Sequence, residues 1–134
     1  MTQTIKAAPV RRSVMVTAPQ ARAFQVSAAI VFQRIAGPVL LGLTPDEAAI
    51  AAALPKARIC LGEIDRLLGD QPFLAGDAVS LADLMMAPHL AYAAATPEGK
   101  TMLKGTGLEA WLARMTARPS MRATLPPAAL RSAA

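Results

Sequence analysis

The chain has 134 residues, which is the size of one small domain with a single hydrophobic core and too short for two catalytic domains. Apolar residues make up 54% of the chain and 30 residues are alanine, which favours helices because alanine gives up no side-chain entropy there. Charged residues at 17% and aromatic residues at 4% exclude an intrinsically disordered chain and a protein that stacks nucleic-acid bases.

The cysteine count bears on metal binding, and the apolar runs bear on membrane association and the cellular compartment. A single cysteine, Cys60, excludes an internal disulfide and a cysteine-rich cluster, so we expect no bound metal. The longest run without charge spans residues 84–97, whereas a transmembrane helix needs about 20 apolar residues. The opening residues MTQTIKAAPVRR contain no apolar core of the signal-peptide type. We therefore expect a cytoplasmic protein with no membrane partner.

The net charge of +5 is unevenly distributed along the chain. Residues 1–43 carry five basic residues and no acidic ones, and the residues from 110 onward carry four basic residues and no acidic ones. All nine acidic residues lie between residues 44 and 109. Basic flanks of this kind can contact phosphates, but helix-turn-helix spacing, zinc ligands and interleaved aromatic residues are all missing. We interpret the flanks as a solvated basic surface and expect no nucleic-acid partner.

The first segment carries one strand pattern, because apolar and polar residues alternate from Val10 to Thr17 before Pro19 ends the run. A lone strand has no partner for its backbone, so we expect residues 1–19 to form a loosely attached arm or an edge paired with another chain. The stretch RRSVMVTAPQARAFQV within residues 8–26 resembles the opening of the START-like, Hsp90-activator-related family. That resemblance implies a small-ligand carrier, but no later segment supplies the remaining strands.

Helical spacing then runs from about Gln20 to Ala36, and Gly37-Pro38 is predicted to stop or kink this helix. The next helix is predicted to begin with a capping box, in which Thr44 is the N-cap and Glu47 lies three residues later. Pro55 is expected to kink this helix near its start. A one-sided apolar stripe follows the cap, at Ile50, Leu54, Ala57, Leu61, Ile64 and Leu68.

The segment QPFLAGDAVSLADLMMAPHLAY, residues 71–92, contains a second capping box in which Ser80 and Asp83 each satisfy a backbone N–H of the other. The helix that follows is apolar nearly all round and is predicted to be the central, buried helix. A short helix is predicted to start at Thr96, and an amphipathic one carries Leu108 and Trp111. The tail LPPAALRSAA is expected to fray.

Three of these segments, GPVLLGLTPDE, FLAGDAVSLADLMMAPHL and LEAWLARMTARPSM, resemble the C-terminal, all-helical domain of cytosolic glutathione transferases of the phi- or theta-like bacterial kind. The resemblance implies an all-α fold, with a helical bundle over residues 28–124 between an arm (1–27) and a frayed tail (125–134). It also implies that Ser80 and Asp83 have a structural role, as the capping box that nucleates the core helix.

The same resemblance implies a function that needs a second domain. Such transferases add glutathione to hydrophobic electrophiles, and they bind and activate glutathione in an N-terminal thioredoxin-like domain. Residues 1–27 are too short for that domain, so we expect neither a cofactor nor conjugating activity from this chain alone. The resemblance carries over an electrophile pocket whose floor matches Phe32 and Ile35, with Arg34 nearby.

An alternative from another class is a non-enzymatic helical module that serves protein assembly. For either function we expect self-association or a thioredoxin-like partner, because the family buries an apolar face of this domain against the thioredoxin half. Hydrophobic small molecules are the expected ligands.

Overall fold

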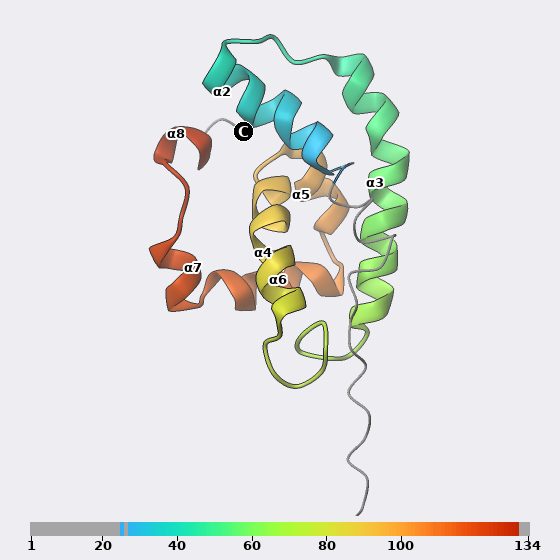
Figure 1. Ribbon diagram of the computed structural model, residues 1–134. Helices are drawn as coiled ribbons and strands as arrows, with labels where there is room; N and C mark the ends of the chain where they lie inside the picture. Colours follow the sequence, from blue (N-terminus) through green and yellow to red (C-terminus); the bar gives the residue numbers. More distant parts are fainter. Residues whose placement is uncertain (1–24, 26, 132–134) are drawn as a thin grey trace, which may run out of the picture.

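The computed structural model describes residue 25 and residues 27–131 (Figure 1). These residues form helices and connecting segments, and the β-contacts among them amount to one isolated bridge between Phe73 and Gly76. The prediction of an all-α fold is confirmed. The predicted strand of the arm and the START-like resemblance lie almost wholly outside the described residues.

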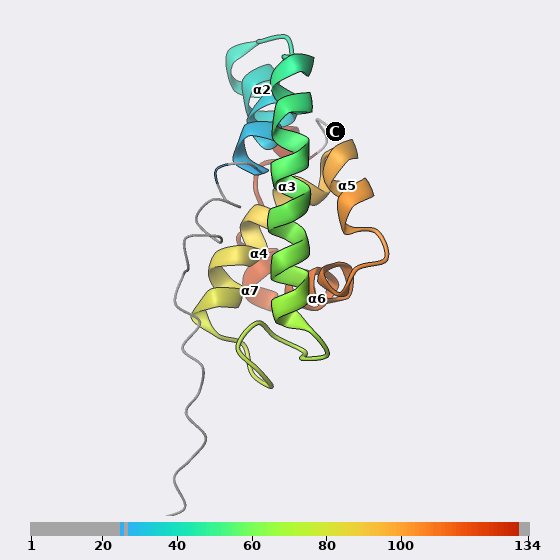
Figure 2. The same ribbon diagram turned by 90° about the vertical axis from the view of Figure 1, so that its right-hand side faces the viewer.

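The helices follow the order that the apolar spacing predicts. Figure 2 shows the long helix α3 running the length of the molecule beside α4, with α5 and α6 on its other side. Within the described residues the named helices are η1 (Phe32–Ala36), α2 (Gly37–Leu41), α3 (Glu47–Leu68), α4 (Leu81–Ala94), α5 (Pro97–Leu103), α6 (Gly107–Thr116), α7 (Pro119–Ala123) and α8 (Ala128–Arg131).

The first helix continues through Gly37-Pro38, where the sequence predicts a stop or a kink. Residues Phe32–Ala36 form one π-helical turn, in which the Gly37 N–H donates to the Phe32 carbonyl five residues earlier. Proline in an ordinary α-helix clashes with the carbonyl four residues before it, and the wider π-turn accommodates Pro38 by displacing that carbonyl. The helix ends at Gly42, which takes the left-handed conformation with φ of 64°.

The start of α3 also differs from the prediction, because its N-cap is Asp46 and not Thr44. The Asp46 carboxylate accepts hydrogen bonds from the Ala48 and Ala49 N–H groups, at 3.0 and 3.1 Å. Glu47 thereby becomes the first helical residue rather than the third residue after the cap, and its carboxylate is free to reach another element. The helix then runs without a break through Pro55 to Leu68.

The core lies where α3, α4, α5 and α6 meet. The predicted stripe of α3 is buried except for Leu54, which is half-buried. Helix α4 lies at the centre, but it is buried on one side only: Leu81 is 72% exposed, and Leu84 and Met85 are also exposed. The buried cluster comprises Leu61, Ile64, Leu68, Leu74, Met86, Ala87, Leu90, Leu103, Leu108, Trp111, Leu112 and Met115.

The C-terminal elements begin where the sequence predicts. Thr96 is the N-cap of α5, and its hydroxyl accepts from the Gly99 N–H at 3.0 Å. Helix α6 starts at Gly107, where the carboxylate of Asp65 on α3 accepts from the Leu108 N–H at 3.0 Å. The tail forms the short helix α8 beyond a segment without helical structure, and its predicted fraying stays a prediction.

Candidate functional site

The carboxylate of Asp83, on the first turn of α4, is fully buried and joins three parts of the chain. Its Oδ2 accepts from the Ser80 N–H at 2.9 Å and from the Ser80 hydroxyl at 2.7 Å. Its Oδ1 accepts from the Leu74 N–H at 2.9 Å and from the Trp111 indole N–H at 2.8 Å. The predicted capping box is confirmed, and the same carboxylate also ties the loop before α4 and helix α6 to the centre of the fold.

These hydrogen bonds decide the charge of Asp83. Burial favours the protonated form, but the donors from Leu74, Ser80 and Trp111 stabilise the carboxylate more strongly and hold the pKa of Asp83 below its ordinary value. A charged, fully bonded and inaccessible carboxylate has no free lone pair for a substrate. Asp83 therefore has the structural role that the resemblance implies.

Arg34, one of the predicted electrophile-site residues, binds two carboxylates from different helices. Its guanidinium donates to Glu47 at the start of α3, with NH1–Oε1 and NH2–Oε2 distances of 2.5 and 2.9 Å. Its Nε donates to Glu98 Oε1, on the first turn of α5, at 2.9 Å. Arg34 thus connects the π-turn to the N-terminal ends of α3 and α5.

The charges of this cluster stabilise one another. The hydrogen bonds that Arg34 donates to Glu98 and Glu47 raise the pKa of Arg34 above its ordinary range. The hydrogen bond from Arg34 lowers the pKa of Glu98, although the partial burial of Glu98 acts in the opposite direction. The cluster fixes the first helix against the rest of the domain, and the Arg34 charge is already paired.

The other two predicted site residues differ in accessibility. Ile35 is 1% exposed and belongs to the core, whereas the Phe32 side chain is 42% exposed on the same π-turn. Phe32 can therefore meet a ligand directly, while Ile35 supports the helix from the inside.

A pocket that sequence reasoning did not find lies between α4 and the C-terminal tail. Its volume is about 350 Å³, within the lower part of the usual range for small-molecule sites. Residues from α4, α7 and the tail line it, among them Pro88, Tyr92, Met121, Leu125 and Leu130. Figure 1 shows α7 and α8 curving round beside α4 at this point. We call this cavity the tail pocket.

The tail pocket offers mainly apolar surface. The hydroxyls of Thr116 and Thr124, which also line it, donate to backbone carbonyls of Leu112 and Ser120 at 2.9 and 2.8 Å. Tyr92 lines the same pocket from α4. The sequence signal for this pocket is weak, because its far wall is the Pro- and Ala-rich tail.

The residues that the structure describes offer neither a metal site nor a membrane-spanning helix. No three His, Cys, Asp or Glu side chains there are arranged to hold a metal ion. No helix in this part of the chain is long and apolar enough to cross a membrane.

The helices and the buried capping aspartate at their centre define an all-helical domain. Residues 47–114, about half of the chain, match the family "Glutathione S-transferase, C-terminal domain". The chain belongs to this family.

Known proteins of similar sequence carry the same family name. Glutathione S-transferase F7 of Arabidopsis thaliana is 30% identical over 100 residues, which cover 75% of this chain and 47% of that protein. Probable glutathione S-transferase GSTF2 of Oryza sativa subsp. japonica is 33% identical over 91 residues, covering 68% and 42% respectively. The chain spans about half the length of the curated relatives it matches.

Solved structures agree with this assignment. The chain superposes on glutathione transferase F7 from Populus trichocarpa with a TM-score of 0.68 and 31% identity, covering 76% of this chain and 47% of that one. On glutathione S-transferase III in its apo form the TM-score is 0.75 at 26% identity, covering 93% of this chain and 60% of that one.

Proposed function

We propose that this chain acts as the helical half of a glutathione transferase of phi- or theta-like bacterial kind and binds hydrophobic electrophiles. The glutathione-binding, thioredoxin-like half is then supplied from outside these 134 residues. The observation that carries the proposal is the tail pocket, an apolar cavity of about 350 Å³ in a domain whose relatives are named as glutathione transferases. Glutathione is the co-substrate under this proposal, and the chain holds no cofactor of its own.

Within the helical half, we assign ligand contacts according to accessibility. Tyr92, Met121 and Leu130 line the tail pocket, and Phe32 presents its ring from the first helix. Arg34 and Ile35 act indirectly, because the first is paired with two carboxylates and the second is buried. The expectation from the sequence differs, because there Phe32 and Ile35 form the floor of the electrophile site and Arg34 lies nearby.

Conjugation by these 134 residues alone is not expected. The nucleophile is a thiolate, and a free thiol has a pKa near 8.5, so the glutathione sulfur needs a fixed donor that favours its ionised form. Holding the electrophile without the activated thiol brings no gain from proximity. We expect a cytoplasmic protein that binds apolar ligands and becomes catalytic with a thioredoxin-like partner.

The partner surface follows from the exposed side of α4. Leu81, Leu84 and Met85 form an apolar strip on a helix whose other side is in the core. Contiguous exposed apolar surface on a domain marks an interaction site when it exceeds a few hundred Å². We propose that a thioredoxin-like partner or a second copy of this chain covers this strip.

The experiment combines two measurements on the purified, mass-verified chain. We expect no conjugation of glutathione to an aryl halide above the uncatalysed rate and no retention on immobilised glutathione. We also expect saturable fluorescence enhancement of anilinonaphthalene sulfonate, reduced by Leu130→Asp in the tail pocket and unchanged by Leu40→Asp at the exposed end of α2. Turnover that a substitution within residues 28–40 abolishes would overturn the first expectation, and equal dye binding by both variants would overturn the second.

The alternative function is a non-enzymatic interaction module. The feature that favours it is the exposed strip on α4. Such a module needs the strip but not the tail pocket. Both functions use the strip, so the dye titration separates them: only the transferase function requires saturable binding in the tail pocket that Leu130→Asp reduces. A wild-type chain that stays monomeric and binds no hydrophobic dye would contradict both.

A further inference from the structure

Gly62 lies in the middle of α3, where glycine weakens a helix relative to alanine because its backbone loses more freedom on folding. Neither of the usual structural reasons for glycine applies to it. Its φ angle is not positive, and a Cβ atom built on it would meet no atom within 4 Å. The fold of the described residues would accept a side chain at this position.

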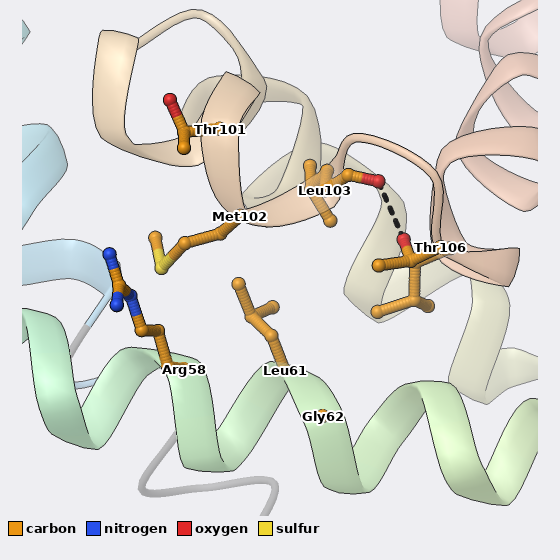
Figure 3. A pocket seen from close by; sticks show the side chains of 8 residues that line it. Arg58, Leu61, Gly62, Thr101, Met102, Leu103 and Thr106 are labelled. Carbon is orange, nitrogen blue, oxygen red and sulfur yellow. Dashed lines mark hydrogen bonds between the residues drawn. The ribbon is translucent and has the colours of Figure 1, made fainter.

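Gly62 does line a hollow between α3 and the segment that contains α5, shown in Figure 3. The hollow has a volume of about 290 Å³. Its floor consists of Leu61, Leu103 and Leu108, which are at most 6% exposed, and the thioether of Met102 borders it. Because Gly62 has no side chain, the hollow stays open along this part of α3. We call it the α3–α5 hollow.

Arg58 stands one turn before Gly62 at the edge of the same hollow (Figure 3). It makes no ion pair or hydrogen bond with the residues that the structure describes, whereas Arg66 on the same helix pairs with Glu63. The two threonine hydroxyls at the edge are already used, since Thr101 donates to the Pro97 carbonyl and Thr106 to the Leu103 carbonyl. Arg58 is thus the charged group that the lining of this hollow presents.

We propose that the α3–α5 hollow binds a small apolar monocarboxylate, with its hydrocarbon part on the leucine floor and its carboxylate on Arg58. A guanidinium matches the fork of a carboxylate and holds it with two parallel hydrogen bonds. A neutral apolar guest would leave Arg58 unpaired, and a dianion would bring a second charge that the lining does not match. The volume, near the lower limit for ligand sites, favours a short molecule.

This site is separate from the tail pocket, so it does not depend on the proposed transferase function. The probe is hexanoate, titrated into the full chain with hexanol as the uncharged control, and followed by NMR of the methionine methyl groups. We expect a saturable shift of the Met102 methyl with hexanoate and a weaker one with hexanol. The Met121 methyl reports the tail pocket in the same spectra.

Variants on α3 test the assignment. Arg58→Gln should weaken hexanoate binding about fivefold, the size expected of an exposed ion pair, while the matched change Arg66→Gln should leave it within about twofold. Gly62→Leu should abolish the saturable Met102 shift by filling the hollow, and Gly62→Ala should retain most of it. Absence of a saturable shift, equal effects of the two arginine changes, or unchanged binding by Gly62→Leu would each overturn the proposal.

Discussion

Replacing Asp83 by alanine should be among the most damaging single changes in this domain. The carboxylate accepts four hydrogen bonds, two of them from the Leu74 N–H and the Trp111 indole N–H. Each buried donor left without an acceptor costs about 1–3 kcal/mol, and loss of a helix cap costs about 0.5–2 kcal/mol. Since the terms are not fully additive, we expect Asp83→Ala to lower the free energy of unfolding by roughly 3–6 kcal/mol.

A loss of this size is a large part of the total stability of a small domain, about 5–15 kcal/mol. Two milder variants therefore accompany it: Ser80→Ala, expected to cost about 0.5–2 kcal/mol, and Trp111→Phe, expected to cost about 1–3 kcal/mol. Urea unfolding followed by far-UV circular dichroism measures all three. Asp83→Ala should show the largest loss of unfolding free energy among the three variants, because only this change removes the acceptor for every donor at once.

The pH dependence gives an independent check. The pKa of Asp83 is lower in the folded chain than its unfolded value of about 3.9, so its stabilising contribution is complete above about pH 4 and is lost as the pH falls through the folded value. Asp83→Asn should therefore lose stability less steeply than the wild type below about pH 4. A midpoint for Asp83→Ala equal to that of Ser80→Ala, or parallel acid profiles for Asp83→Asn and wild type, would refute the reasoning.

Three further substitutions test other positions. Gly99→Ala should destabilise the domain by about 1–3 kcal/mol, because the new Cβ atom would lie 1.8 Å from the Ala93 carbonyl oxygen. Gly62→Ala should instead stabilise the domain by about 0.5–1 kcal/mol, because a Cβ atom there would meet no atom within 4 Å. Thermal unfolding compares the two variants, and a Gly99→Ala variant as stable as the wild type would contradict the close approach. Arg34→Met should leave Glu98 without its cation and cost about 1–3 kcal/mol at pH 7. Because Arg34 lowers the pKa of Glu98, the variant should also lose less stability than the wild type on acidification below about pH 4. Chemical denaturation at pH 7 and pH 3 measures this loss. Equal losses of unfolding free energy in the variant and the wild type would contradict the prediction.

Local signals in the sequence predicted the helices and part of the site. The bonds between Ser80 and Asp83 connect residues three positions apart, so a short motif is enough to find them. The bonds from Leu74 and Trp111 to the same carboxylate could not be predicted, because they depend on how a loop and a distant helix pack.

Competing local signals explain the errors. Thr44 and Asp46 are both good N-caps within three residues, and the choice falls on Asp46, which leaves Glu47 where it can pair with Arg34. That pairing joins residues 13 positions apart and leaves no pattern in the sequence. The tail pocket was missed for the same reason, since its walls come from α4 and from a tail without a clear helical pattern.

The π-turn at residues 32–36 contains one residue more than a turn of a regular α-helix. Each helical residue advances about 100° round the axis, so the faces before and after the turn are offset by one such step. If this sequence is aligned without a gap to that of a regular α-helix, either Phe32 or the residues beyond Gly37 are therefore placed on the wrong face of the helix. Deleting a single residue from this turn should restore a regular helix and rotate α2, turning the exposed side chains of Leu40 and Leu41 toward a different neighbour.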